Sequence, residues 1–364
     1  MAELSRLRVI ALGFRLDSAS LVRMSLEQFL LAKGISAEKT LEIEYIKSVA
    51  PRKQEEPSLH NDWVSAVDGS CPRFILTGCY DGFWKVWRGA GQCTHMLEGH
   101  SDAITSVGII NHGDTDTVTV ATASKDQTLR LWKFDTAKSI KIILQRFREP
   151  FKILLVDTNG ICTERSDTEG NLVSIKKRKV KNEAEESQLE RESFSTLVGH
   201  TQCVSAVVWP ERETIYSASW DHSIRRWDVE TGKDSSKIFC GKALNCVHIG
   251  GEGSALIAAG GSDAILRIWD PRKPGSSAPI YQFSSHTSWI SACKWHDKSW
   301  FHLLTSSYDG KACCGIVDCK GTWPLAVIES HEDKVLCADW WKSDSLISGG
   351  VDCKLCISSD ISIL

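Results

Sequence analysis

The chain has 364 residues, a formal net charge of −3 at pH 7, and 42% hydrophobic and 24% charged residues. This composition is typical of a soluble globular protein with one large domain or two ordinary domains. The negative balance argues against general electrostatic attraction to nucleic acid or to an anionic membrane. No apolar run approaches the ~20 residues that span a bilayer, so we expect no membrane partner.

The 14 cysteines are scattered at irregular spacing. The N-terminal stretch MAELSRLRVIALGF has neither the apolar core nor the cleavage site of a signal peptide, so we expect free, buried thiols in a reducing compartment. One CxxC pair, Cys353 and Cys356, falls on a predicted strand, where residues three apart point to opposite faces and do not share an ion. The pattern indicates no metal site and no cofactor.

Residues 1–47 contain two predicted elements and no repeat. SLEQFLLAKGIS predicts a short amphipathic helix that begins at Ser25 and ends near Lys33 and Gly34. KTLEIEYIKS, residues 39–48, alternates apolar and polar residues and predicts a half-exposed strand. A polar linker over 48–59 follows.

The rest of the chain, from about residue 60, is built from a repeat. Tryptophan is unusually frequent, at 14 residues against 5 tyrosines. An aspartate precedes a tryptophan by six residues four times, at Asp81, Asp126, Asp221 and Asp263, and equivalent turns hold Asp309 and Asp352. These six aspartates are 45, 95, 42, 46 and 43 residues apart. Because 95 is close to twice the other intervals, one unit has lost its markers, and the period predicts an all-β WD-repeat β-propeller of nominally seven blades with the third degraded.

The stretch SASWDHSIRRWDVETGK, residues 217–233, contains the residue types of a hydrolase triad. A catalytic triad occurs once, however, whereas this set recurs along the chain. By resemblance to the WD-repeat family, the four groups hydrogen-bond inside a blade: His200, Ser217 or Ser219, Asp221 and Trp227. The same network implies roles for His100, Asp126, Trp132, Asp263 and Trp269. We therefore expect no catalytic residue, no small-molecule substrate and no enzyme activity, and the chain has no GxxxxGK[ST], HExxH or GxSxG motif.

The degraded third unit is followed by a charged insertion at about 174–194. The stretch FKILLVDTNGICTERSDTEGNLVSI offers one hairpin around its DTNG turn but none of the marker residues. The insertion then carries a basic cluster, Lys176, Lys177, Arg178, Lys179 and Lys181, before an acidic run. Such a cluster indicates a nuclear import signal or a weak RNA contact, and the alternative is a solvated loop of balanced charge.

The two ends of the propeller domain, residues 60–364, are predicted to meet. The C-terminal stretch KLCISSDISIL is too short to supply both remaining strands of the last blade. We therefore expect the linker 48–59, or the strand before it, to provide the missing outer strand.

A more specific resemblance rests on LVRMSLEQFLLAKGISAEKTLEIEYIKS, HNDWVSAV, SLVGHTQCV, WDHSIRRWDVETGK, WDPRKPG and HEDKVL. With these stretches the chain resembles the WD-repeat subunits of the Pescadillo–Bop (PeBoW) complex, particularly plant members. The resemblance implies a non-enzymatic scaffold in the nucleus, nucleolus and nucleoplasm, with Pescadillo-type and Bop-type partners and the pre-60S particle. It implies a role in large-subunit rRNA processing with at most indirect or weak RNA contact.

In that family the N-terminus is a ubiquitin-like domain that the AAA ATPase Midasin grips, and an acidic loop residue completes the coordination of Midasin's divalent ion. The matching residue is Glu38, in GISAEKT, and the alternative is one solvated charge among many. Here MAELSRLRVIALGFRLDSAS stands in place of the expected hairpin and longer helix, so residues 1–47 resemble only a partial ubiquitin-like (α+β) segment. KACCGIVDCK likewise stands where a KxxLWD strand is expected.

A different function remains open at this point. Many propellers are substrate receptors of cullin-type ubiquitin ligases, and neither WDVETGK nor WDPRKPG distinguishes the two functions. Co-purification with pre-60S factors or with cullin subunits separates them.

Overall fold

The computed structural model describes residues 12–16, 20–22, 43–47, 53–55, 57–89, 91–112, 117–135, 140–146, 153–155, 195–211, 213–251, 253, 255–272, 278–299, 302–318, 321–359 and 361. Within these ranges the chain is all-β, and no helix long and apolar enough to cross a membrane is found in them.

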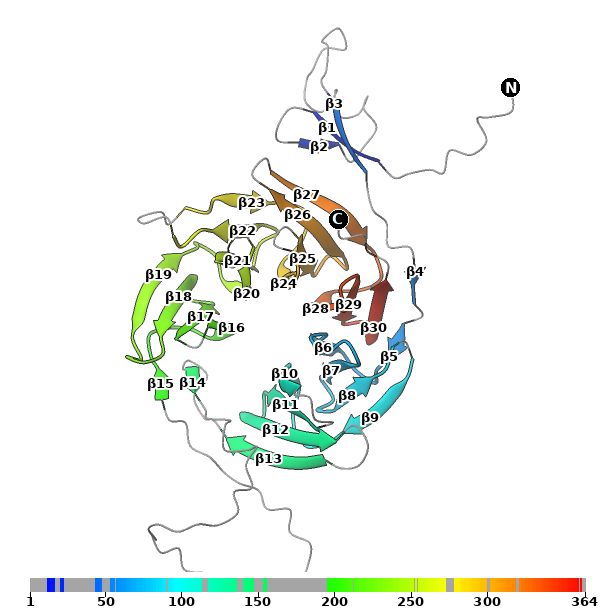
Figure 1. The fold of residues 1–364 in the computed structure, drawn as a ribbon, viewed down its shortest axis with the longest axis vertical. Coiled ribbons are helices and arrows are strands. Elements are labelled where there is room, and N and C mark those ends of the chain that lie inside the picture. Colours follow the sequence, from blue (N-terminus) through cyan, green and yellow to red (C-terminus); the bar gives the residue numbers. More distant parts are fainter. Residues whose placement is uncertain are drawn as a thin grey trace, which may run out of the picture.

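Six antiparallel sheets stand around a common axis as the blades of a propeller (Figure 1). Five of them take their strands from one continuous stretch each. Blade I is β6 (Val64–Asp68), β7 (Ile75–Cys79), β8 (Trp84–Trp87) and β9 (Cys93–Leu97); blade II is β10 (Ile104–His112), β11 (Thr117–Ser124), β12 (Thr128–Asp135) and β13 (Ile140–Arg146); blade III is β16 (Val204–Glu211), β17 (Thr214–Ser219), β18 (Ser223–Asp228) and β19 (Asp234–Phe239). Blade IV is β20 (Leu244–Gly250), β21 (Leu256–Gly261), β22 (Leu266–Trp269) and β23 (Tyr281–Phe283); blade V is β24 (Ile290–Trp295), β25 (His302–Ser307), β26 (Ala312–Asp318) and β27 (Gly321–Ile328).

Blade VI joins the two ends of the propeller. Its strands β28 (Val335–Trp341), β29 (Ser345–Gly350) and β30 (Lys354–Ser359) come from the C-terminus. The linker supplies the outer strand: β4 (Lys53–Gln54) and β5 (Ser58–Leu59) both pair antiparallel with β30. The expected closing strand is thus present, and it covers an edge that would otherwise expose unpaired backbone groups.

The degraded third unit predicted from the sequence falls between the blades numbered II and III here. At this place the structure describes only a two-stranded sheet. β14 (Ile153–Leu155) pairs with β15 (Ser195–Leu197), about forty residues later. Residues 156–194, which include the DTNG turn and the charged insertion, lie outside the described residues. Leu197 is buried against Ile215 and Trp227, so this small sheet packs on blade III.

The N-terminal segment corrects one sequence expectation. β1 (Leu12–Leu16) and β2 (Ser20–Val22) form a hairpin where none was expected, and β3 (Ile43–Lys47) pairs antiparallel with β1. The strand predicted at 39–48 is therefore present as β3, whereas the helix predicted from Ser25 lies outside the described residues. KACCGIVDCK also forms a regular strand, β26, in which Ala312, Cys313 and Cys314 are buried. With these small buried side chains, the strand packs into the core without the residues of the KxxLWD pattern.

The core lies between blades. Every residue of β7, β17, β21, β25 and β29 is buried, because each of these strands is covered on both faces by neighbouring blades. Between blades III and IV, for example, Ala218 and Ile224 pack against Leu244 and Ile257. A buried large aliphatic side chain contributes about 1.5–3 kcal/mol, so these inter-blade clusters stabilise the ring.

Polar side chains at one repeated position also join neighbouring blades. The fifth residue of each innermost strand is, from blade I to blade VI, Asp68, Gly108, Val208, His248, Lys294 and Asp339. His248 Nδ1 accepts a hydrogen bond from Trp295 N of blade V at 3.2 Å. Asp339 accepts one from Gly69 N of blade I at 3.1 Å, and Asp68 accepts one from Ile109 N of blade II at 2.8 Å.

Lys294 completes this series between blades V and VI. The charge of Asp339 raises the pKa of Lys294, against the opposing effect of burial. Burial raises the pKa of Asp339, against the opposing effect of Lys294, and the nearby carboxylate of Asp68 adds to the increase. The ammonium of Lys294 therefore lies within electrostatic range of the carboxylates of Asp339 and Asp68 at half-buried positions of blades V, VI and I.

Candidate functional site

The groups that resemble a catalytic triad form a closed hydrogen-bond chain inside blade III. The Trp227 indole donates to Ser217 Oγ at 2.8 Å, Ser217 lies 2.7 Å from His200 Nε2, and His200 Nδ1 lies 2.8 Å from Asp221. Ser217 is fully buried, and the side chain of His200 is 1% exposed. A triad needs a nucleophile that a substrate reaches, so this arrangement is structural.

Blade II repeats the chain with the same geometry. Trp132 donates to Thr122 Oγ1 at 2.8 Å, His100 Nε2 lies 2.7 Å from the same oxygen, and His100 Nδ1 lies 2.9 Å from Asp126. The recurrence in a second blade supports the structural role expected for His100, Asp126 and Trp132.

Of the two serines left open by the sequence, Ser217 is the network member and Ser219 is not. Ser219 lies at the end of β17, where its hydroxyl donates to the carbonyl of Gln202 at 3.2 Å and accepts from Asp221 N at 3.1 Å. Only Ser217, two residues earlier, lies between the His200 ring and the Trp227 indole. Ser219 instead fixes the turn that carries Asp221.

Blade IV departs from the expected network. Cys240 and Ala259 stand where blade III has His200 and Ser217, so neither a histidine nor a hydroxyl is available. Asp263 pairs instead with Arg267, at 2.7 Å and 3.1 Å. Trp269 is buried in the core between blades III and IV. Asp263 and Trp269 thus have structural roles, but not within the predicted four-member chain.

The remaining blades keep partial chains that the sequence reasoning did not place in the network. His286 connects Thr305 with Asp309, and His331 connects Ser348 with Asp352. In blade I, Trp87 donates to Thr77, which lies 3.2 Å from His60. The signal for all three is a histidine four residues before an innermost strand.

In blades II and III the network carboxylates are ionised and the histidines neutral at physiological pH, because the pKa values of both kinds of group are lowered. Burial alone would raise the pKa of Asp221, but hydrogen bonds from Ser223 and His200 outweigh it and lower the pKa to about 2. Burial lowers the pKa of His200, although Asp221 opposes the change. A neutral imidazole with its proton on Nδ1 donates to the carboxylate and accepts from the hydroxyl, so every buried polar group of the chain is paired.

The turn that holds each network aspartate also presents side chains to solvent. In each of the six blades one backbone hydrogen bond joins two turns. The donor is the N–H of the residue just before the repeat aspartate. The acceptor is the carbonyl three residues after the repeat histidine, whose place Cys240 takes in blade IV. In blade I this bond joins Tyr80 N to Trp63 O, and in blade V it joins Tyr308 N to Trp289 O, both at 3.0 Å. The two positions therefore lie side by side on one face of the ring, which we call the His–Asp face.

Two blades carry aromatic pairs at these positions, and the four residues form what we call the aromatic patch: Trp63, Tyr80, Trp289 and Tyr308. The ring centroids are 5.1 Å apart in the first pair and 6.0 Å apart in the second, which is stacked. Trp63 is 41% exposed and Trp289 is 49% exposed. Both pairs lie on the His–Asp face, one in blade I and one in blade V, on either side of blade VI.

A lysine borders the patch. Lys125 holds the equivalent position in blade II, and its ammonium lies 4.4 Å from the centre of the Tyr80 ring. Exposed Trp and Tyr side chains beside a cation are typical of protein-binding hot spots. The sequence reasoning missed this patch, although the residue before each repeat aspartate is the signal that could have found it.

Other predicted residues cannot be placed beside it. Glu38 and the basic cluster from Lys176 to Lys181 lie outside the described residues. The CxxC cysteines have different neighbours: Cys353 Sγ lies near the carbonyl of Val351, and Cys356 Sγ lies near that of Ser330. Among the described residues, no group of three or more His, Cys, Asp or Glu side chains is placed to hold a metal ion.

Comparisons with known proteins agree with this geometry. The family described as "WD domain, G-beta repeat" matches residues 55–88, 91–133, 191–228, 277–314 and 322–357. A protein of Arabidopsis thaliana named "Ribosome biogenesis protein WDR12 homolog" is 62% identical, over 96% of this chain and 85% of its own length. The protein of the same name from Oryza sativa subsp. japonica is 58% identical over the same shares, and that from Chlamydomonas reinhardtii is 31% identical over 93% and 85%. The chain therefore belongs to the WD-repeat family and, within it, to the group of WDR12 homologues.

Proposed function

We propose that this chain is a non-enzymatic scaffold in ribosome biogenesis that protein partners hold through the aromatic patch. The names of its relatives support the process. The aromatic patch supports binding of protein partners, because it presents two exposed tryptophans beside two tyrosines on the ring. Aromatic anchors of this kind supply most of the free energy of many protein interfaces.

The finer form of the proposal follows the resemblance seen in the sequence. A Bop-type protein binds the propeller and a Pescadillo-type protein completes the trimer, which acts in large-subunit rRNA processing on the pre-60S particle. The proposed location is the nucleolus and nucleoplasm. Contact with RNA is indirect or weak, since the chain has a net charge of −3.

A separate element of the proposal concerns release from the pre-ribosome. The segment 1–47 is proposed to be a partial ubiquitin-like unit that a Midasin-type AAA ATPase grips, with Glu38 as ligand to a divalent ion held by that enzyme. A hard cation with an open position binds a carboxylate oxygen. Glu38→Gln should leave the chain on pre-60S particles longer than Glu42→Gln does in a sedimentation assay, and equal release of both variants would contradict the proposal.

Nuclear import is proposed to depend on the basic cluster Lys176, Lys177, Arg178, Lys179 and Lys181. Replacing all five by glutamine in a fluorescent fusion should shift the protein to the cytoplasm. If the fluorescence stays nuclear, the cluster is a solvated loop and not an import signal.

The central test is affinity purification of the full chain from plant cells. Trp63→Ser with Trp289→Ser should reduce co-purified pre-60S factors at least about tenfold, because loss of an anchor tryptophan costs 2 kcal/mol or more. Trp220→Ser is the matched control, since Trp220 is 51% exposed on blade III, outside the patch. Recovery of cullin subunits instead of pre-60S factors would favour a ubiquitin-ligase receptor and overturn the proposal.

A further inference from the structure

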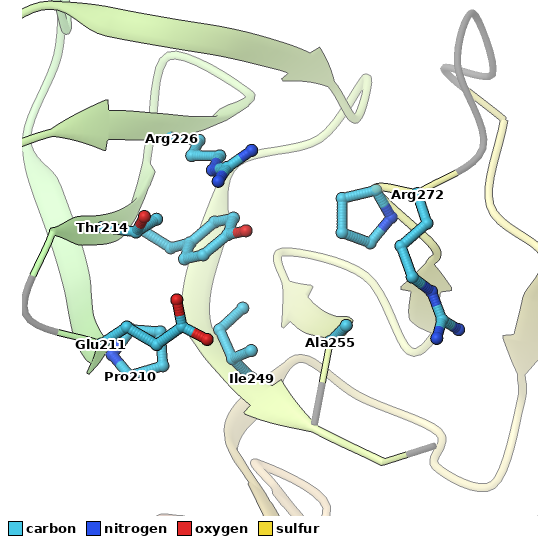
Figure 2. A pocket seen from close by; sticks show the side chains of 9 residues that line it. Pro210, Glu211, Thr214, Arg226, Ile249, Ala255 and Arg272 are labelled. Carbon is cyan, nitrogen blue, oxygen red and sulfur yellow. The ribbon is translucent and has the colours of Figure 1, made fainter. Parts of the chain in front are cut away.

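A second candidate site lies between blades III and IV, where their shared core reaches the surface (Figure 2). A cavity of about 260 Å³ opens there. Its apolar part includes Ile249 and Ala255, and its polar part includes Tyr216, Glu211 and Arg226 from blade III and Arg272 from the blade IV side. None of these residues belongs to the aromatic patch.

The cavity coincides with a break in the repeat. In blade III, Tyr216 and Arg226 are directly opposite each other on β17 and β18. In the other five blades the equivalent cross-strand pair is apolar: Leu76–Val86, Ala121–Leu131, Ala258–Ile268, Leu304–Cys314 and Ile347–Ile357. The equivalents of Arg226 are at most 3% exposed, whereas Arg226 itself is exposed. Only blade III thus replaces packing at this position with hydrogen-bond donors.

Both donors face the same space. Side chains directly opposite on an antiparallel pair project from the same face, and Tyr216 packs with Ile249 of blade IV, so this face is the one toward the cavity. Arg272 is already bound by Asp270, at 2.8 Å and 3.1 Å. For Arg226, by contrast, no hydrogen bond or close ion pair of the guanidinium is found among the described residues, and its charge acts at longer range on Asp228. Burial raises the pKa of the Tyr216 phenol, so its hydroxyl keeps a proton to donate.

We propose that this cavity binds an aspartate or glutamate side chain from a peptide segment of a partner protein, with Arg226 and the Tyr216 hydroxyl donating to the carboxylate. Arginine presents two parallel N–H groups that match a carboxylate. The volume is below the roughly 300–1,000 Å³ of small-molecule sites, and so it suits one anchoring side chain better than a free ligand. Glu211 at the same wall repels a dianion such as a phosphate more strongly than it repels a single carboxylate, and it accepts from a neighbouring N–H or basic group of the peptide.

The test uses the full chain and fluorescein-labelled hexapeptide pools, degenerate except for a central glutamate, glutamine or phosphoserine. Fluorescence anisotropy should show the glutamate pool binding at least about tenfold more tightly than the glutamine pool, since the difference is one charge-assisted contact. Arg226→Leu should abolish that preference. It restores the apolar pair of the other blades, so the melting temperature should be unchanged or higher.

Two further variants sharpen the result. Tyr216→Phe keeps the ring and removes one donor, so it should weaken the preference by a smaller factor than Arg226→Leu. Arg88→Leu, at an exposed arginine of blade I, is the matched control and should leave the preference intact. Equal binding of the glutamate and glutamine pools, or a preference that survives Arg226→Leu, would overturn the proposal. Arg226-dependent preference for the phosphoserine pool would also overturn it, in favour of a phosphopeptide site. None of these variants alters the aromatic patch, so this test is separate from that of the proposed function.

Discussion

The two sides of the ring are joined in different ways. From blade III through blade VI to blade II, polar side chains of the innermost strands bond to an adjacent blade: besides the bonds of Asp68, His248 and Asp339, Ser205 donates to Leu244 O at 2.6 Å, Asn245 donates to Ile290 O at 3.0 Å, and the Trp340 indole of blade VI donates to Lys294 O of blade V at 3.0 Å. After blade II, the equivalent fifth position is Gly108, which has no side chain to bond to a neighbour. Thr105 there bonds to Ala123 O of its own blade.

This difference shows how a propeller tolerates a degraded unit. A ring of blades distributes its stability over junctions, each of which contributes its own packed cluster and its own polar contacts. The strongly joined arc includes blade VI, where the two ends of the domain meet through β4 and β5. The stretch between blades II and III therefore does not have to hold the ends together.

The largest expected effect comes from breaking the strongly joined arc at its closing strand. Removing residues 1–59 deletes β4 and β5, leaves β30 as an exposed edge, and should yield a chain that aggregates or unfolds without a sharp transition. Removing residues 1–47 is the control, because it keeps both strands. Thermal denaturation followed by circular dichroism distinguishes the two, and similar melting curves would contradict this role of the linker.

Lys294 should be the most sensitive single residue of the same arc. Lys294→Met leaves the half-buried carboxylates of Asp339 and Asp68 without their cation, and loss of a charged partner at such partly desolvated groups should cost about 3 kcal/mol. Val208→Ala, at the equivalent position of blade III, removes two methyl groups from a half-buried side chain in the core between blades III and IV and should cost about 1 kcal/mol. Urea denaturation gives both free energies of unfolding, and equal losses would show that the charged junction contributes no more than an apolar one.

Within a blade, the next largest effect should come from the shared hydroxyl. Ser217→Ala leaves the Trp227 indole N–H and His200 Nε2 without a partner in a buried site, which should cost about 2–3 kcal/mol. Ser236→Ala, on the exposed outer strand of the same blade, should change the free energy of unfolding by less than about 0.5 kcal/mol. If the two serine variants unfold at the same urea concentration, the network does not stabilise the blade.

The repeat itself could be predicted from sequence because its marker residues have to be paired inside each blade. Spacing between aspartates predicted seven units, of which the structure shows six as blades. It could not distinguish Ser217 from Ser219, since both lie on the same face of one strand. The partner of β14 could not be predicted either, because β15 lies about forty residues later, beyond the reach of turn patterns.

Features that depend on contacts between blades were also beyond sequence reasoning. Tyr216 and Arg226 appear unremarkable in the sequence and become unusual only when each blade's cross-strand register is compared. The aromatic patch likewise combines residues from blades I and V, more than 200 positions apart, which only the closed ring brings to one face.

The smallest expected effect at neutral pH concerns His248, which links blades IV and V. Burial lowers its pKa to about 3, below the value near 6.5 of an unfolded histidine. Below pH 6.5 the unfolded chain therefore binds a proton that the folded chain does not, so this contribution to stability is complete above pH 6.5 and is lost as the pH falls toward 3. The loss amounts to about 1.4 kcal/mol per pH unit.

His248→Asn keeps an acceptor for Trp295 N and removes the titration. Urea denaturation at pH 7, 6 and 5 should show the free energy of unfolding of this variant falling less steeply than that of the parent chain, by about 1.4 kcal/mol per unit. His95→Asn, on the outer strand of blade I, is the control and should follow the parent. If the His248 variant has the parent's slope, the histidine is not held neutral, and the junction between blades IV and V would then have to accommodate a charge beside Lys294.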